Sequence, residues 1–226
     1  MSYHVRSMLN EDIFQVTEID RAVFPAFWPP INYGNELKNQ LAYYFVACKD
    51  EETSERSEVG DNKVRGFLAL ITRVRRFFDH NRVTVNKLLP AKHNIIGFVG
   101  FWLMAGEAHV MNIAVRESYR RQGVGELLLI SIIERAVELK AQVVTLEVRV
   151  SNIAARTLYS NYGFVEMGLR RGYYENKEDG VVMTIDITRS QFHERFQRLT
   201  QAYSKKWGVA LNQQIIRNLP GQPGGG

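Results

Sequence analysis

The sequence contains a single cysteine and no long apolar run. Cys48 has no second cysteine in the chain with which to form a disulfide bond. No stretch approaches the roughly 18 apolar residues of a membrane-spanning helix, and the first residues, up to Asp12, lack the apolar core of a secretory signal. The five histidines do not show the close spacing of a zinc site. These absences predict a cytoplasmic protein with no membrane contact and no bound metal.

Length and charge predict one domain with a basic extension. A chain of 226 residues can bury one sizeable core. The formal net charge is +5, and the whole excess falls in residues 189–226, where six Lys or Arg residues stand against one Glu. We predict a domain over residues 1–188 and a C-terminal extension whose end, from Leu219, is disordered. The basic extension either docks on RNA or forms a solvated face.

The most informative stretch runs from Met111 to Leu129. A β-forming apolar run ends near Val115, and Arg120-Arg121-Gln122-Gly123-Val124-Gly125 then precedes a long apolar-periodic segment. This order predicts strand, loop and helix. The first N–H groups of such a helix have no intrahelical partners and lie at the positive end of its dipole. Gly123 and Gly125 lack Cβ atoms and the arginines add donors, so the loop predicts a phosphate or pyrophosphate site.

Two common phosphate-binding motifs do not fit this loop. A P-loop requires Lys and Ser or Thr after its last glycine, whereas Glu126 and Leu127 follow here. A dinucleotide fingerprint requires a small residue at the position of Leu128, and it normally follows the first strand of its fold. A glycine turn without a ligand remains the alternative on these six residues alone.

The periodicity predicts alternating strands and helices. The helix after the glycine loop connects two strands in a crossover of the size that makes them parallel. The charged segment 49–62 and an amphipathic helix from Phe67 to Phe77 form an insertion, which is either a lid or partner-binding element or a packed peripheral helix. The expected strands are 3–8, 41–48, 95–104, 108–115, 143–150, 165–170 and 181–187, and the expected helices 13–24, 34–40, 127–140, 153–162 and 190–203.

Two residues beyond the glycine loop are candidates for chemistry. Strand alternation places Glu147 in the middle of a sheet that both faces cover, where a carboxylate is rarely left without a purpose. The alternative is an ion pair with Arg149 or with a helix arginine. Tyr159 follows the helix cap Asn152, and it is either a catalytic residue or a buried core tyrosine.

Several ordered motifs together resemble one enzyme family, the GNAT superfamily of N-acetyltransferases, and within it the RimI type. The resemblance is loose over residues 1–48 and close over 95–187, and it leaves out the insertion 50–94 and the tail after Thr188. RimI enzymes acetylate the N-terminal alanine of a small-subunit ribosomal protein. The motifs are Glu107-Ala108-His109, Asn112 to Val115, Arg120 to Gly125, Leu146 to Asn152, Leu158-Tyr159, Tyr162-Gly163-Phe164 and Arg170 to Tyr174 with Glu178-Asp179.

The resemblance implies an α/β (α+β) GNAT fold and a set of site residues. Helices would cover both faces of a mixed central sheet, and the parallel strands 110–115 and 143–150 would splay to admit acetyl-CoA. Glu147 would be the base, acting through a water, and Tyr159 the acid. The cofactor residues would be Ile113, Ala114, Val115, Arg120, Arg121, Gln122, Gly123, Val124, Gly125 and Asn152. The peptide residues would be Phe24, Phe27, Trp28, Tyr173 and Tyr174, with Glu107 as an anchor or second base.

We therefore predict transfer of an acetyl group from acetyl-CoA to a protein N-terminal amine, with a ribosomal protein as the expected partner. An α-amino group has a pKa of about 7.7–8.0 against about 10.4 for lysine, so more of it is uncharged near neutral pH. One alternative is acetylation of lysines or of many protein N-termini. Another is a module without catalysis that senses acetyl-CoA or binds RNA through its tail. Composition alone also leaves open that the aromatic loop from Phe24 to Pro30 folds onto the core edge.

Overall fold

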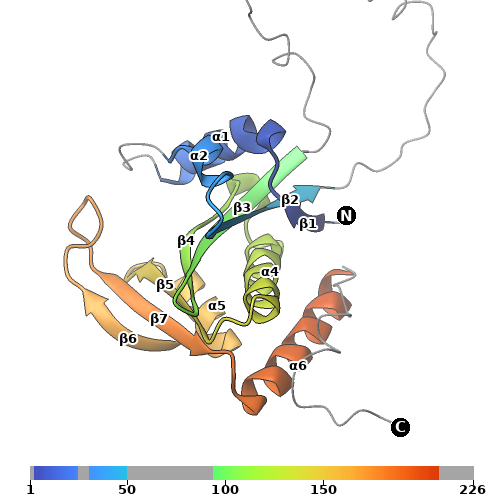
Figure 1. Cartoon of the computed structure of the whole chain (residues 1–226), viewed down its shortest axis with the longest axis vertical. Helices are drawn as coiled ribbons and strands as arrows, with labels where there is room; N and C mark the ends of the chain where they lie inside the picture. Colours follow the sequence, from blue (N-terminus) through green and yellow to red (C-terminus); the bar gives the residue numbers. More distant parts are fainter. Residues whose placement is uncertain (1–2, 25–30, 50–93, 209–226) are drawn as a thin grey trace, which may run out of the picture. The chain divides into compact units, whose positions relative to one another are not determined.

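The computed structural model describes residues 3–24, 31–49 and 94–208 (Figure 1). The chain divides into two compact units, residues 1–50 with 93–226 and residues 51–92. The second unit, with the expected helix from Phe67 to Phe77, lies outside the described residues, and so does the segment from Leu219. The fold below is that of the first unit.

A seven-stranded sheet forms the centre, in the order β1-β2-β3-β4-β5-β7-β6. Neighbouring strands are antiparallel except β4 and β5, which are parallel as predicted. The strands are β1 (Tyr3–Ser7), β2 (Ala42–Lys49), β3 (Asn94–Met104), β4 (Glu107–Val115), β5 (Val143–Arg149), β6 (Val165–Arg170) and β7 (Gly180–Asp186), and the helices are α1 (Ile13–Val23), α2 (Tyr33–Glu36), α4 (Val124–Glu138), α5 (Ile153–Tyr162) and α6 (Ser190–Trp207).

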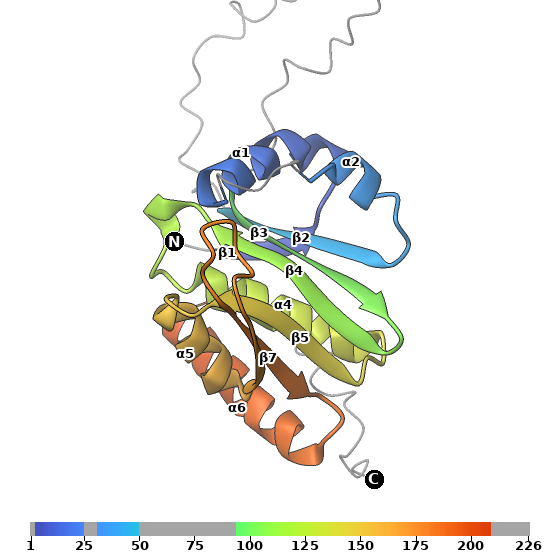
Figure 2. The ribbon, with the colours of Figure 1, turned by 90° about the vertical axis from the view of Figure 1, so that its left-hand side faces the viewer.

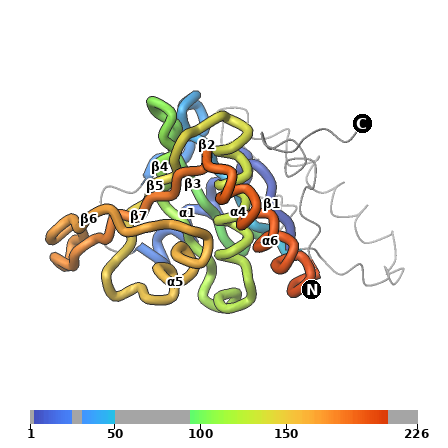
Figure 3. Tube along the Cα trace, turned by 90° about the horizontal axis from the view of Figure 1, so that it is seen from below, coloured from blue at the N-terminus to red at the C-terminus, as the bar shows by residue number. Residues whose placement is uncertain are grey.

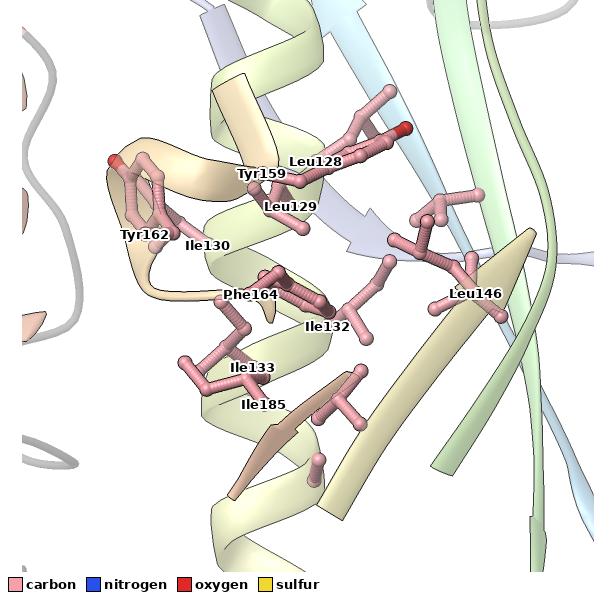
Figure 4. Packing of buried hydrophobic residues seen from close by; sticks show 14 of the residues in the cluster. Leu128, Leu129, Ile130, Ile132, Ile133, Leu146, Tyr159, Tyr162, Phe164 and Ile185 are labelled. Atoms are coloured by element: carbon pink, nitrogen blue, oxygen red, sulfur yellow. The ribbon is translucent and has the colours of Figure 1, made fainter. Parts of the chain in front are cut away.

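Helices cover both faces of the sheet, which confirms the predicted fold class. Successive residues of β3 belong to two different cores: Phe98 packs with α1 and α2, and Val99 packs with α4. Figure 2 shows α4 on one side of the strands and α1 with α2 on the other. The larger core surrounds α4, whose Leu128, Leu129 and Ile132 are fully buried (Figure 4).

The second helix is shorter than the expected 34–40. It ends at Glu36 because the amides of Lys38 and Asn39 bond three residues back, to the carbonyls of Asn35 and Glu36. These tighter turns lead into β2. The difference does not affect the strands that carry the candidate site.

The pairing of the parallel strands β4 and β5 ends half-way along β4. Their pairing runs from Glu107 opposite Val143 to Val110 opposite Leu146 and then stops. At this level the partner strand β3 shifts register, so that Met111 bulges between two paired positions. The splay that the resemblance implied is therefore confirmed, and it opens beside Glu147.

The last two helices follow their local signals. Helix α5 has the predicted bounds, and Gly163 ends it in a left-handed conformation (φ 101°). Helix α6 runs to Trp207, four residues beyond the expected end at Tyr203. Figure 3 shows α6 beside α4. Helix α6 also contacts α5, where the guanidinium of Arg195 donates to the carbonyl oxygen of Asn161 at the end of α5 (2.7 Å).

Candidate active site

The Glu147 carboxylate lies at the point where β4 and β5 separate. Its side chain is only 5% exposed, and it binds a different group through each oxygen. Oε2 lies 2.9 Å from Nε2 of His109, and Oε1 lies 2.9 Å from a guanidinium nitrogen of Arg170. The expected alternative, a pair with Arg149 or a helix arginine, is wrong about the partner, because Arg149 turns to Glu178 instead (3.1 Å).

His109 is the site residue that sequence reasoning missed. It stands opposite Thr145 in the parallel pair, and Glu147 is the next residue of β5 on the same face. Its other ring nitrogen, Nδ1, lies 3.7 Å from a carboxylate oxygen of Glu107. Because β4 and β5 were predicted to be parallel, a comparison of the residues on their common face would have indicated this contact.

These contacts shift the pKa values of Glu147 and His109 in opposite directions. The hydrogen bond from His109 lowers the pKa of Glu147, and Arg170 lowers it further, against the opposing effect of burial. The same hydrogen bond raises the pKa of His109, again against burial. Glu147 is therefore ionised near neutral pH and is a weak base alone, whereas an imidazole such as that of His109 is the side chain suited to proton transfer.

Tyr159 is buried on α5 with 4% of its surface exposed. Its ring packs near Phe164, at 5.8 Å between centroids, and Figure 4 shows its hydroxyl directed away from that of Tyr162 and toward the strands. Burial, with the nearby Tyr174, raises the pKa of Tyr159 above its usual value. The phenol is therefore both a core residue and a group that stays protonated at neutral pH.

The glycine loop forms the beginning of α4. Gly123 is the N-cap residue in a left-handed conformation (φ 81°). A Cβ at Gly125 would meet only Val115, at 3.8 Å, so that side is open. A Cβ at Gly123 would lie 2.6 Å from the indole ring of Trp207. Trp207 therefore fills the side of Gly123 on which a Cβ would stand, and the approach of a phosphate to the other backbone groups of Gly123 stays a prediction.

Two of the remaining loop residues form hydrogen bonds to β1 and β4. Gln122 accepts a hydrogen bond from the hydroxyl of Tyr3 (2.6 Å), and Nε of Arg120 donates to the carbonyl of Val115 (3.3 Å). Arg120 and Arg121 are exposed, and Val124 is buried in the α4 core. The start of α4 therefore has one open position, at Gly125, and the two exposed arginines precede it in the same loop.

The backbone of β4 presents polar groups to the gap beside β5. The amide of Arg116 donates to the Ile96 carbonyl of β3 (2.8 Å), and backbone groups point to alternate sides along a strand. Those of Ile113 and Val115 therefore face the gap, whereas those of Ala114 face β3. Asn152 is exposed and caps α5, where its side chain accepts from the Ala155 amide (3.2 Å).

The expected peptide residues are divided between described and undescribed parts of the chain. Tyr173 is 46% exposed, and the guanidinium of Arg170 lies 5.3 Å from its ring centre. Tyr174 is half-buried under Arg149 (3.9 Å). Phe24 packs partly against the α1 core, and Phe27 and Trp28 lie outside the described residues.

Comparison with known proteins places this geometry in a family. The profile of the Acetyltransferase (GNAT) family matches residues 70–164. A Bacillus subtilis (strain 168) protein, provisionally named ribosomal protein bS18-alanine N-acetyltransferase, is 32% identical over 81% of this chain and 95% of its own length. The chain belongs to the GNAT family of acetyltransferases. An N-alpha-acetyltransferase of Sulfurisphaera tokodaii is likewise 32% identical, over 82% of this chain and 93% of its own length.

The fold of this GNAT protein agrees with that of a solved structure. Arabidopsis thaliana NAA60 in complex with acetyl-CoA superposes with a TM-score of 0.61, at 15% identity over 83% of this chain and 99% of that chain. GNAT enzymes take the acetyl group from acetyl-CoA. The open side of Gly125, the free amides at the start of α4 and the splayed strands fit its diphosphate and its extended arm.

Two further findings concern the described residues only. No helix among them has the length and apolar character needed to cross a bilayer. No group of three or more His, Cys, Asp or Glu side chains among them is arranged to hold a metal ion.

Proposed function

We propose that the protein transfers the acetyl group of acetyl-CoA to the N-terminal amine of a protein. The observation that carries this proposal is the His109–Glu147 pair, which lies where β4 and β5 separate and hence beside the gap suited to the thioester arm. The diphosphate would lie on the amides and arginines from Arg120 to Gly125. Ile113 and Val115 would bond the arm through their backbone groups, and Asn152 would contact it from α5.

His109 accepts the proton that the incoming ammonium must lose. A carboxylate can only accept a hydrogen bond, so the 2.9 Å contact with Glu147 places the imidazole proton on Nε2 and the lone pair on Nδ1. After proton transfer, the imidazolium lies between the carboxylates of Glu147 and Glu107. Glu147 therefore acts by holding and polarising the base, whereas the resemblance implied that Glu147 itself is the base, acting through a water.

The acetyl transfer then needs one acid. The amine nitrogen forms a bond to the thioester carbonyl carbon and gives its second proton to solvent, the carbon–sulfur bond breaks, and the sulfur takes a proton. Tyr159 can supply that proton because burial keeps its phenol protonated at neutral pH. Solvent then restores the phenol proton, and the backbone N–H of Val115 would stabilise the oxyanion between these steps.

The proposed substrate is an alanine N-terminus of a small-subunit ribosomal protein. Two relatives at 32% identity support N-terminal acetylation by their names, and one of the two names bS18. An α-amino group with a pKa of about 7.7–8.0 suits a histidine base better than a lysine does. Tyr173, exposed beside Arg170, and Phe24 would wall the peptide groove.

The test is acetylation of synthetic peptides with acetyl-CoA, followed by mass spectrometry. We expect the α-amino group of an Ala-starting bS18 peptide to be acetylated at least about tenfold faster than an internal lysine of the same peptide. Tyr159→Phe is the control for the site and should lower kcat by about 10²–10⁴ with unchanged CoA affinity. Faster lysine acetylation, equal rates on unrelated N-termini, or no acetylation would contradict the proposal.

A further inference from the structure

The C-terminal helix α6 ends on the glycine loop. The ring of Trp207 occupies the space in front of the Gly123 Cα, where a Cβ would come within 2.6 Å of it. The hydroxyl of Tyr203, one turn earlier, donates to the Gly123 carbonyl oxygen (3.3 Å), although the two residues are 80 positions apart in the sequence. Two side chains of α6 thus contact two sides of one backbone residue.

Gly123 is also the residue that sets the direction of α4. It is the N-cap residue, its φ of 81° is left-handed, and its carbonyl accepts the amide of Leu127 in the first helical turn (2.9 Å). The amides that follow it are those proposed to bind the diphosphate. A small rotation at Gly123 would turn these amides away from a common point, so the loop can bind the diphosphate in only one backbone conformation.

The contacts of α6 with the loop are separate from those that hold the helix on the body. At its other end α6 buries Phe192 and Phe196, and Arg195 bonds the end of α5 through Asn161. Removal of the Trp207 ring should therefore leave the helix in place. The ring has a local role at the loop in addition to its share of the core.

We propose that Trp207 and Tyr203 are positioning residues for acetyl-CoA, which hold Gly123 so that the amides at the start of α4 converge on the diphosphate. The inference rests on the proposed placement of the diphosphate at this loop. It also explains why the two glycines differ: Gly125 leaves room for the ligand, and Gly123 leaves room for Trp207. Neither α6 residue touches the reacting atoms.

The expected signature is weaker cofactor binding with unchanged chemistry. If the loop keeps its competent shape for only about a tenth of the time without the Trp207 ring, the apparent Kd for CoA rises about tenfold. Glu147 alternates along β5 with Leu146 and Val148, which belong to the core that includes α6. The His109–Glu147 pair therefore lies on the other face of the sheet, so kcat at saturating acetyl-CoA should stay within about twofold.

The experiment compares Trp207→Ala with the matched variant Phe192→Ala in the full-length protein. Calorimetric titration with CoA and steady-state kinetics should show Kd and KM about tenfold higher for Trp207→Ala. Phe192→Ala removes a buried ring from the same helix, so it should lower Tm at least as much while leaving the Kd unchanged. Trp207→Phe should restore most of the affinity. Tyr203→Phe, which removes only one hydrogen bond, should raise Kd by about two- to fivefold.

Unchanged Kd in both Trp207→Ala and Tyr203→Phe, or the same increase in Phe192→Ala, would overturn the positioning role. Gly125→Trp separates this outcome from a failure of the proposed placement, because it fills the open side of the loop. If Gly125→Trp abolishes CoA binding while the α6 variants bind normally, the diphosphate site stands and the positioning role is refuted. If Gly125→Trp binds CoA normally, the placement itself is wrong.

Discussion

At the scale of single residues, the proposed base is the pair of His109 and Glu147 and not one carboxylate. Oε2 of Glu147 binds Nε2 of His109, and Oε1 of Glu147 binds the guanidinium of Arg170. The hydrogen bond to Glu147 raises the pKa of His109, and the charge of Arg170 acts in the other direction. Since neutral His109 is the proposed proton acceptor, the acid limb of the pH–rate profile should follow its pKa.

Glu147→Gln should move this limb to lower pH. The change removes the negative charge that stabilises imidazolium, so the pKa of His109 falls toward its ordinary value near 6.5 and the neutral form persists at lower pH. We also expect kcat/KM at high pH to fall by about 10²-fold, because the ring is less well held. The measurement is kcat/KM between pH 5.5 and 9 with one peptide, so that the titration of the substrate amine is common to all variants.

Arg170→Gln is the matched control with the opposite sign. Loss of the guanidinium removes the influence that lowers the pKa of His109, so the limb should move to higher pH. Limbs that coincide in wild type, Glu147→Gln and Arg170→Gln would show that only the substrate amine titrates, and that His109 is not the base.

At the scale of elements, the sequence predicts what local signals determine. The bounds of α5 follow from the Asn152 cap and the left-handed Gly163, which lie next to the helix they delimit. The bulge at Met111 leaves no such signal, yet it puts His109 and Asn112 on the same face of β4. The contact of Trp207 with Gly123 joins distant segments, so no spacing rule could reveal it.

The glycine loop provides a prediction for the element as a whole. Gly125→Trp should abolish CoA binding, since the open side next to Val115 would be filled by an indole. Gly168→Trp is the matched control, because a Cβ at Gly168 in β6 meets nothing within 4 Å, and it should bind CoA like wild type. Calorimetry with CoA measures both, and circular dichroism shows that both are folded. Equal affinity for the two variants would refute the placement.

At the scale of the molecule, the sheet is continuous across the insertion. Lys49 and Asn94, the described residues on either side of the insertion, are paired at the adjoining ends of β2 and β3. The sequence showed this segment through its charge and turn residues, which mark a departure from the family pattern. It could not show the two separate cores on the sheet faces, because these depend on strand order.

The core around α4 contains a buried carboxyl group, that of Glu134, whose titration makes the free energy of unfolding depend on pH. Glu134 is 8% exposed, and burial, with the charge of Glu138, raises its pKa to about 7. A folded-state pKa above the unfolded value means that the folded protein holds the proton. The resulting stability is complete below about pH 4.5 and is lost as pH rises through about 7.

Glu134→Gln should therefore stabilise the protein at alkaline pH only. The amide mimics the protonated acid, so wild type and variant should have similar Tm values at pH 5, while at pH 8.5 the variant should gain up to about 3 kcal/mol. For a domain of this size that corresponds to several degrees in Tm. Differential scanning calorimetry at the two pH values provides the comparison. Glu138→Gln is the control: because it keeps the buried carboxylate of Glu134, it should still lose most of the stability that wild type loses between pH 5 and pH 8.5. A Tm difference between wild type and Glu134→Gln that is the same at both pH values would mean that Glu134 does not titrate in this range.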